Sequence, residues 1–230
     1  MNVKADSDIV NNRSIGDVLD YLTALRANRP SVTLSKGRSP KGGKTIAQIL
    51  SAARIVFIRD GYGGVSLRKI AKEAGLALGN VSYYFPTKQA LVSASLQEAM
   101  ADYIGEFYQH LQLEKDTPID VLLNAVTFYV RNSRSSYPFF FQLWGYAATS
   151  PEAKQLIREL YQPIDQFIFH LVRACNPALD EQETRKAVFQ IFSMEQGMKL
   201  TIGMGHFDDV RDDSAEQTIR DATKRLVCAA

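Results

Sequence analysis

Two short helices joined by a tight glycine turn are the feature that most constrains the fold of this chain. Ser66 is placed to cap a helix that runs to about Ala74. Gly75 follows, and glycine adopts the left-handed backbone of such a turn at the least cost. A second short helix then spans about residues 78–85, and Pro86 ends it. This is a helix-turn-helix pattern, in which the first helix braces the second and the second can enter the major groove of DNA.

A longer helix is expected on each side of this pair. The first begins at Thr45, with Gln48 three residues further on, and it ends at Gly61. The second has Thr87 as its cap and runs over residues 88–112. Residues 45–91 therefore predict a bundle of helices built around the short pair.

The rest of the chain also carries helix signals. Helix starts are expected at Thr117-Pro118-Ile119-Asp120, at Ser150-Pro151-Glu152, at Asp180 with Glu183, and at Ser214 with Gln217. An additional short amphipathic helix is expected over residues 15–27, and no alternating strand pattern is evident. The predicted fold class is all-α. An N-terminal three-helix helix-turn-helix domain precedes a larger helical domain, with roughly nine helices from residue 45 onward.

The charge distribution is uneven, although the net charge is +2. Residues 21–88 carry 12 Lys and Arg side chains against Asp60 and Glu73, which gives this block a charge of +10. The segments on either side of the block are acidic. A basic block on an acidic body is typical of a module that binds a polyanion, although a solvated charged face would have the same composition.

The helix-turn-helix divides into an inner and an outer set of residues. The expected small core consists of Ile70, Ala71, Ala74, Leu76, Val81 and Phe85. The expected outer face of the second helix consists of Leu78, Gly79, Asn80, Ser82, Tyr83 and Tyr84. An asparagine can form two hydrogen bonds with adenine, a leucine can contact a thymine methyl, and hydroxyl groups can bond phosphates or base edges. Thr45, Ser66 and Lys88 are expected at helix starts, where free N–H groups attract phosphate.

This segment resembles the DNA-binding domain of tetracycline-repressor-like (TetR-family) transcriptional regulators. The resemblance keeps its spacing without gaps and rests on Ile49, Ala52, Ala53, Phe57, Gly61-Tyr62, Ser66-Leu67-Arg68, Ile70-Ala71, Ala74-Gly75-Leu76, Gly79-Asn80-Val81, Tyr84-Phe85-Pro86, Lys88 and Leu91. The family usually has a tyrosine at the position of Ser82 and often has a serine or threonine at the position of Ala77. The second short helix is therefore expected to begin with a weaker cap than is usual in the family.

The resemblance implies a DNA-binding transcriptional regulator, most often a repressor, that acts as a homodimer on a near-palindromic double-stranded operator. It also implies a small-molecule effector that releases the protein from DNA. The candidate DNA contacts are Lys44, Thr45, Ser66, Arg68, Leu78, Gly79, Asn80, Ser82, Tyr83, Tyr84 and Lys88. The predicted domains are an extension with a short helix and a basic linker (1–42), the DNA-binding domain (43–103, with the motif at 66–85), and a ligand-binding and dimerisation domain (104–230).

Aromatic residues are frequent in the C-terminal part of the chain. They can pack a core, or they can line a cavity for an apolar or aromatic molecule. The resemblance implies a ligand pocket among these helices, and the candidate ligand-binding residues are Phe107, Phe128, Phe140, Trp144 and Phe167. Glu195 lies within an apolar helical pattern, where it is either a bonded structural group or a partner for a cationic ligand. On the same expected helix, Phe189 and Phe192 point away from the main apolar stripe, which leaves a face for a second copy of the chain.

Other function classes find little support in the sequence. We expect no enzyme and no cofactor, since no Ser/His/Asp grouping, glycine-rich phosphate loop or paired carboxylates are evident. Cys175 and Cys228 lie far apart in the sequence, and neither they nor the three histidines have the spacing of a metal or redox site. Residues 1–20 lack an apolar run and no segment is long enough to span a bilayer, so a cytoplasmic protein without a membrane partner is expected. An interaction module whose helix-turn-helix binds protein remains as the alternative.

Overall fold

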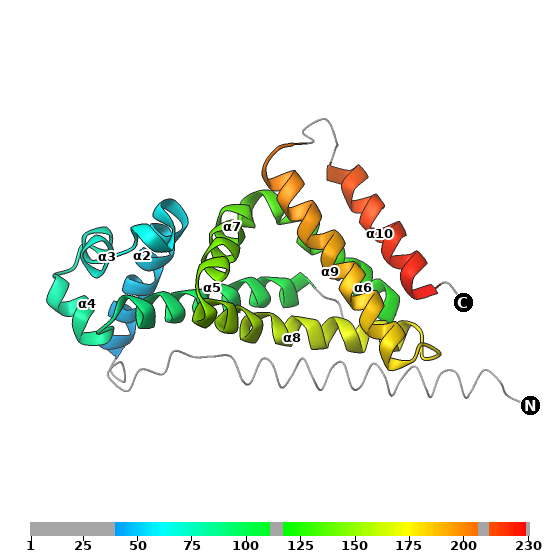
Figure 1. Ribbon diagram of the computed structural model, residues 1–230, viewed down its shortest axis with the longest axis horizontal. Coiled ribbons are helices and arrows are strands. Elements are labelled where there is room, and N and C mark those ends of the chain that lie inside the picture. The colour runs from blue at the N-terminus through cyan, green and yellow to red at the C-terminus, as the bar shows by residue number, and fades with distance from the viewer. Residues whose placement is uncertain (1–39, 111–116, 207–211, 229–230) are drawn as a thin grey trace, which may run out of the picture. The chain divides into compact units, whose positions relative to one another are not determined.

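The computed structural model describes residues 40–110, 117–206 and 212–228. Within these ranges the chain forms nine α-helices and no strand (Figure 1). They are α2 (Pro40–Gly64), α3 (Leu67–Ala74), α4 (Leu78–Tyr84), α5 (Lys88–His110), α6 (Pro118–Arg131), α7 (Ser133–Thr149), α8 (Pro151–Cys175), α9 (Glu181–Gly203) and α10 (Asp212–Cys228). The all-α prediction is confirmed, whereas the helix expected over residues 15–27 lies outside the described residues. None of the helices in the described ranges has the length and apolar character needed to cross a membrane.

Local capping explains where several helices begin. At the start of α6 the Thr117 side chain accepts the backbone N–H of Asp120, whose carboxylate accepts the N–H of Thr117. Asp180 and Glu183 form the same reciprocal pair at the start of α9. These two predicted starts are confirmed. The predicted start of α8 is confirmed as well, because the Ser150 hydroxyl accepts the N–H of Ala153 at 3.0 Å.

Two other helix starts are predicted too late along the chain. α2 begins at Pro40, so residues 40–42, which the sequence analysis assigned to a linker, are helical. Proline is favoured at the first helical position because its fixed φ suits the helix, which explains the earlier start. The Thr45 hydroxyl therefore lies inside α2, where it donates to the Lys41 carbonyl at 3.0 Å instead of capping the helix. α10 likewise begins at Asp212 and not after Ser214.

Gly61 interrupts α2 as predicted. Its φ of 65° and ψ of 173° lie outside the helical region, and glycine takes this conformation without strain. A Cβ atom at this position would lie 2.9 Å from Oε1 of Gln142 in α7. The backbone conformation of Gly61 therefore interrupts α2, and its missing side chain leaves space for the end of the Gln142 side chain.

The described residues divide into two compact units. The N-terminal unit comprises residues 40–105 and 138–160, and the C-terminal unit comprises residues 106–110, 117–137, 161–206 and 212–228. Residues 138–149 of α7 and residues 151–160 of α8 thus belong to the same unit as the helix-turn-helix. The functional division predicted at residue 103 assigns them to the ligand-binding domain, and it stays a prediction.

Aromatic side chains join α7 to α2 inside the N-terminal unit. Phe57 is fully buried, and its ring centroid lies 6.5 Å from that of Phe139 and 6.3 Å from that of Tyr146. Tyr62, at the end of α2, stacks on Tyr146 with a centroid separation of 3.9 Å. Such contacts between rings add to the hydrophobic stabilisation of the unit.

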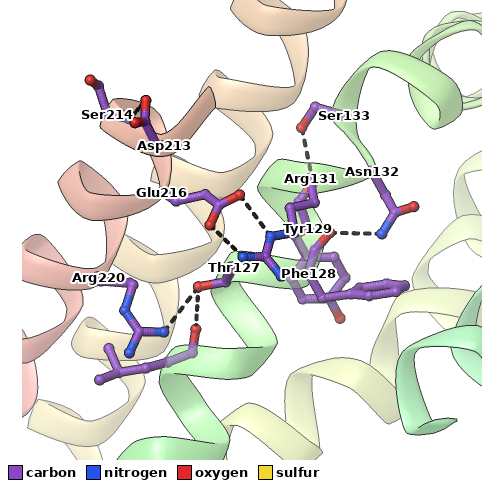
Figure 2. A network of polar contacts seen from close by, with 11 residues as sticks. Thr127, Phe128, Tyr129, Arg131, Asn132, Ser133, Asp213, Ser214, Glu216 and Arg220 are labelled. Carbon is purple, nitrogen blue, oxygen red and sulfur yellow. Dashed lines mark hydrogen bonds and ion pairs between the residues drawn. The ribbon is translucent and has the colours of Figure 1, made fainter. Parts of the chain in front are cut away.

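Helices α6, α9 and α10 pack against one another inside the C-terminal unit, where α10 lies beside α9 (Figure 1). Figure 2 shows the polar contacts that join α6 to α10. The Arg131 guanidinium donates to both carboxylate oxygens of Glu216, at 2.7 and 2.9 Å. Arg220 donates to the Thr127 hydroxyl at 3.2 Å, and that hydroxyl donates to the Leu123 carbonyl at 2.7 Å. These contacts fix the register of α10 along α6.

Candidate nucleic-acid interface

The turn between α3 and α4 has the geometry that the sequence predicts. The Ser66 hydroxyl accepts the backbone N–H of Lys69 at 3.2 Å and so caps α3. Gly75 ends α3 with φ 64° and ψ 31°, in the left-handed region. Backbone bonds from Gly75 to Lys72 (3.2 Å) and from Leu76 to Ala71 (2.9 Å) close the turn. The angle between α3 and α4 is therefore set by backbone hydrogen bonds as well as by packing.

α4 is anchored on one side and exposed on the other. On the inner side, Val81 of α4 and Phe85 directly after it are fully buried, and so is Ile70 of α3, as predicted. Leu76 is half-buried. On the outer side Leu78 is 40% exposed and Tyr83 is 56% exposed. Gly79 and Asn80 are also exposed, whereas Ser82 and Tyr84 are half-buried. The outward face of α4 thus consists mainly of Leu78, Gly79, Asn80 and Tyr83, and it is narrower than the face that the sequence analysis proposed.

The start of α4 lacks a side-chain cap. Ala77 occupies the capping position in an extended conformation and makes no side-chain hydrogen bond there. The weaker cap that the sequence predicts is therefore confirmed. Substituting a capping residue by alanine typically costs about 1 kcal/mol of helix stability, so α4 depends on its buried residues for its stability.

Gln48 braces the helix-turn-helix from α2. Its side-chain amide donates to the backbone carbonyl of Ala74, at the end of α3, with a distance of 2.6 Å. Carbonyls in the last turn of a helix have no partner within the helix, so this bond satisfies one of them. The sequence analysis gave Gln48 a different role, because a contact across 26 residues leaves no local pattern.

The two acidic residues of the basic block are bound by basic residues of the same block. Asp60 accepts hydrogen bonds from Lys69 and from Arg59, each at 2.9 Å, and Glu73 accepts one from Arg59 at 2.9 Å. The bond from Lys69, followed by that from Arg59, holds the pKa of Asp60 below its usual value. These pairs fix the end of α2 against α3, so Arg59 and Lys69 serve the fold of the unit.

Arg54 is exposed and lies 3.7 Å from the carboxylate of Asp102. Four further basic side chains of the block are exposed: Lys41, Lys44, Arg68 and Lys72. None of them forms an ion pair with another residue in the described part of the chain. Exposed cations of this kind can neutralise phosphates and release the counterions bound to them. Lys72 was not among the candidate contacts, and the signal that could have found it is the charge of the block.

Lys88 takes a different position from the one expected. Its ammonium nitrogen lies 4.1 Å from the centroid of the Tyr62 ring, and burial lowers its pKa. A cation over an aromatic face is attracted by the ring quadrupole. Because Tyr62 also stacks on Tyr146, Lys88 of α5 takes part in the packing of α2 against α7. Its assignment to phosphate stays a prediction, as does that of Thr45.

The candidate ligand-binding residues fall into two groups. In the C-terminal unit, the ring centroid of Phe107 lies 5.3 Å from that of Phe128 and 5.5 Å from that of Phe167. Tyr129, which the sequence analysis did not select, stacks on Phe107 at 5.6 Å. In the N-terminal unit, the ring centroids of Phe140 and Trp144 lie 6.1 Å apart. The first group is almost fully buried. In the second group, the ring centroid of Phe140 also lies 5.2 Å from that of Tyr103 and 5.3 Å from that of Phe139.

The helix-turn-helix segment matches a known family. Residues 49–94 fit the model of the bacterial regulatory proteins of the tetR family. The match covers about a fifth of the chain and makes this segment similar to a tetR-family domain. The HTH-type transcriptional regulator PksA of Bacillus subtilis (strain 168) is 37% identical over 82 residues, which are 34% of this chain and 40% of PksA. The chain thus matches less than half the length of that curated relative.

Solved structures extend the likeness beyond the tetR-family domain. A proposed transcriptional regulator from Pseudomonas aeruginosa PAO1 superposes with a TM-score of 0.72 at 16% identity, over 86% of this chain and 96% of that one. A second transcriptional regulator, from Saccharomonospora viridis in complex with choline, superposes with a TM-score of 0.66 at 18% identity. This match covers 78% of the present chain and 95% of that one. These similarities concern the fold, and they confirm the predicted helical domain after the helix-turn-helix.

Proposed function

We propose that this chain regulates transcription by binding double-stranded DNA through α4. The observation that carries this proposal is the exposed face of Leu78, Gly79, Asn80 and Tyr83 on a helix that buried Val81 holds in place. The tetR-family domain and the exposed cations of α2 and α3 support it. Asn80 would contact a base edge, while Arg68 and Lys72 would contact phosphates.

We further propose that two copies of the chain bind DNA together as a homodimer through α9 and α10. Phe189 on α9 is 72% exposed, whereas Val188 and Ile191, on the other side of the helix, are buried. A large exposed aromatic side chain is costly in water and is commonly covered by a partner. A two-fold dimer would present one α4 to each of two half-sites, which favours a near-palindromic operator.

Replacing Asn80 with alanine is expected to weaken operator binding about 5- to 150-fold, the range for one lost bidentate base contact. Alanine is a good helix former, so α4 should persist in the variant. The operator can be obtained by selecting bound sequences from a random duplex pool with the full chain. Fluorescence anisotropy at fixed salt then gives the affinity of each variant.

Gln155→Ala, at an exposed position of α8, is the control for this experiment and should bind like the parent protein. Arg68→Ala and Lys72→Ala should each flatten the dependence of log K on log salt by about one unit, regardless of sequence. If no duplex is retained at low salt, DNA binding is rejected and the helix-turn-helix is better explained as a protein-binding module.

We also propose that the protein is a repressor released by a small apolar or aromatic effector that binds in the C-terminal unit. The clustered rings of Phe107, Phe128, Tyr129 and Phe167 support this. The Saccharomonospora viridis neighbour was solved with choline, and aromatic rings bind quaternary ammonium groups well. α5 contains both Lys88 and Phe107, so a movement of this helix would couple effector binding to DNA binding.

An effector of this kind is expected to weaken operator binding about 5- to 150-fold, the usual range of allosteric coupling. The protein–operator complex can be titrated with neutral aromatic compounds and with choline, and anisotropy reports release. Phe128→Ala should reduce the response, whereas Phe141→Ala, at a half-exposed position of α7, should not. If no compound changes the affinity, the effector proposal fails while DNA binding stands.

A further inference from the structure

The fold brings together the two cysteines that the sequence separates. Cys175 is the last residue of α8 and Cys228 is the last residue of α10. The residues next to them are bonded, since the Asn176 side-chain amide donates to the Val227 carbonyl at 3.0 Å. Burial raises the pKa of Cys175, and the charge of Cys228 raises it further. They are the two cysteines of the 230-residue chain.

The two thiols differ in reactivity. Cys228 is exposed, so a dissolved oxidant can reach its sulfur. Cys175 is half-buried, and its pKa is raised to about 12, mainly by burial and further by Cys228 and the carboxylate of Asp120. Because the thiolate is the reactive form of cysteine, Cys175 should react poorly with an oxidant on its own. This is the usual division between an exposed attacking thiol and a neighbouring resolving thiol.

We propose that Cys175 and Cys228 form an oxidation site that a hydroperoxide converts into an intramolecular disulfide between the ends of α8 and α10. The Cys228 thiolate attacks the peroxide, the O–O bond breaks, and the sulfur becomes a sulfenic acid while hydroxide leaves as water. The Cys175 sulfur then displaces the sulfenic oxygen, which takes up the thiol proton and leaves as a second water. Two thiols and one hydrogen peroxide thus give one disulfide and two waters.

The geometry favours a disulfide between Cys175 and Cys228 of the same chain. A disulfide requires Cβ atoms about 3.5–4.5 Å apart, and Cys228 ends its helix, so the last turn of α10 can adjust while α6 holds the rest of the helix. The bond between Asn176 and Val227 joins the residues next to the two cysteines. The resolving thiol is therefore present at a high local concentration, which favours the disulfide over further oxidation of Cys228. This site is independent of the proposed DNA and effector functions.

The experiment treats the full chain with stoichiometric hydrogen peroxide, blocks free thiols with an alkylating reagent and maps tryptic peptides by mass spectrometry. We expect a peptide pair that joins Cys175 to Cys228 within a monomer and separates on reduction. Thermal unfolding should occur about 5 °C or more above that of the reduced protein, because a disulfide constrains the unfolded chain. Reduction should reverse the shift.

Two variants keep the test decisive. Cys228→Ser, at an exposed position, should fold normally and leave Cys175 as a free thiol after the same treatment. Cys175→Ser should leave Cys228 to progress to sulfinic acid or to pair between chains. The proposal is overturned if the parent protein gives a disulfide between two Cys228 residues, or a sulfinic acid at Cys228 with the Cys175 thiol intact.

Discussion

Replacing Gly203 with alanine is expected to lower the free energy of unfolding by about 3 kcal/mol, near the upper end of the usual cost of overpacking. Gly203 is the last residue of α9, and Tyr137 lies directly against it. A Cβ atom at position 203 would overlap both the Cβ atom and the ring of Tyr137. The obstructing atoms include the stem of the side chain, which cannot swing away without a shift of the α7 backbone.

Gly197→Ala is the matched control, because it introduces the same methyl group on the same helix. A Cβ atom at position 197 would meet nothing within 4 Å. Alanine is the better helix former by about 1 kcal/mol, so this variant should be neutral or more stable. Urea unfolding followed by circular dichroism gives both values. Equal midpoints for the two variants would show that α9 and α7 are not in close contact at Gly203.

The sequence predicts the parts of this fold that depend on neighbouring residues. The capping boxes at Thr117 and Asp180 each lie within four residues, and the structure contains both. The glycine turn at Gly75 is equally local. The start of α2 is predicted too late because Thr45 and Pro40 both resemble helix starts, and the sequence alone does not rank them.

In the candidate site, too, local features could be predicted from the sequence and long-range contacts could not. The outward position of Leu78, Asn80 and Tyr83 follows from helical periodicity, so it could be predicted. The position of Lys88 on the ring of Tyr62 depends on Tyr146, which is distant in the sequence. The pairing of Cys175 with Cys228 depends on two separate helices ending at the same place. Such contacts are set by tertiary packing and leave no periodic signal.

The second large effect is expected from a buried pair of charges on α9. Glu195 and Lys199 lie one helical turn apart and are 4% and 1% exposed. Burial raises the pKa of Glu195 and lowers that of Lys199, and the charge of each residue partly offsets the shift of the other. The Lys199 ammonium also lies 5.7 Å from the centroid of the Tyr129 ring. The charge of Lys199 supports the structural role among the two that the sequence left open for Glu195, and this role stays a prediction.

Replacing Glu195 with alanine is expected to cost about 3–5 kcal/mol of unfolding free energy, because it removes a charge that offsets the burial of Lys199. The double variant Glu195→Leu with Lys199→Met removes both charges and keeps similar volumes. It should unfold near the parent protein or above it, since well-packed apolar residues often replace a buried ion pair without loss. A double-mutant cycle by urea unfolding isolates the coupling between the two residues.

An exposed pair on the same helix provides the control for this cycle. Glu181 and Arg185 are also one turn apart, with an N–O distance of 2.9 Å, but both side chains are more than half exposed. Glu181→Ala should cost about 0.5 kcal/mol or less, as solvent screens such pairs. If Glu195→Ala costs no more than Glu181→Ala, water must reach Lys199 in solution and the pair is not a buried one. A large cost that persists in the double variant would instead assign the stabilisation to the packing of the Glu195 side chain.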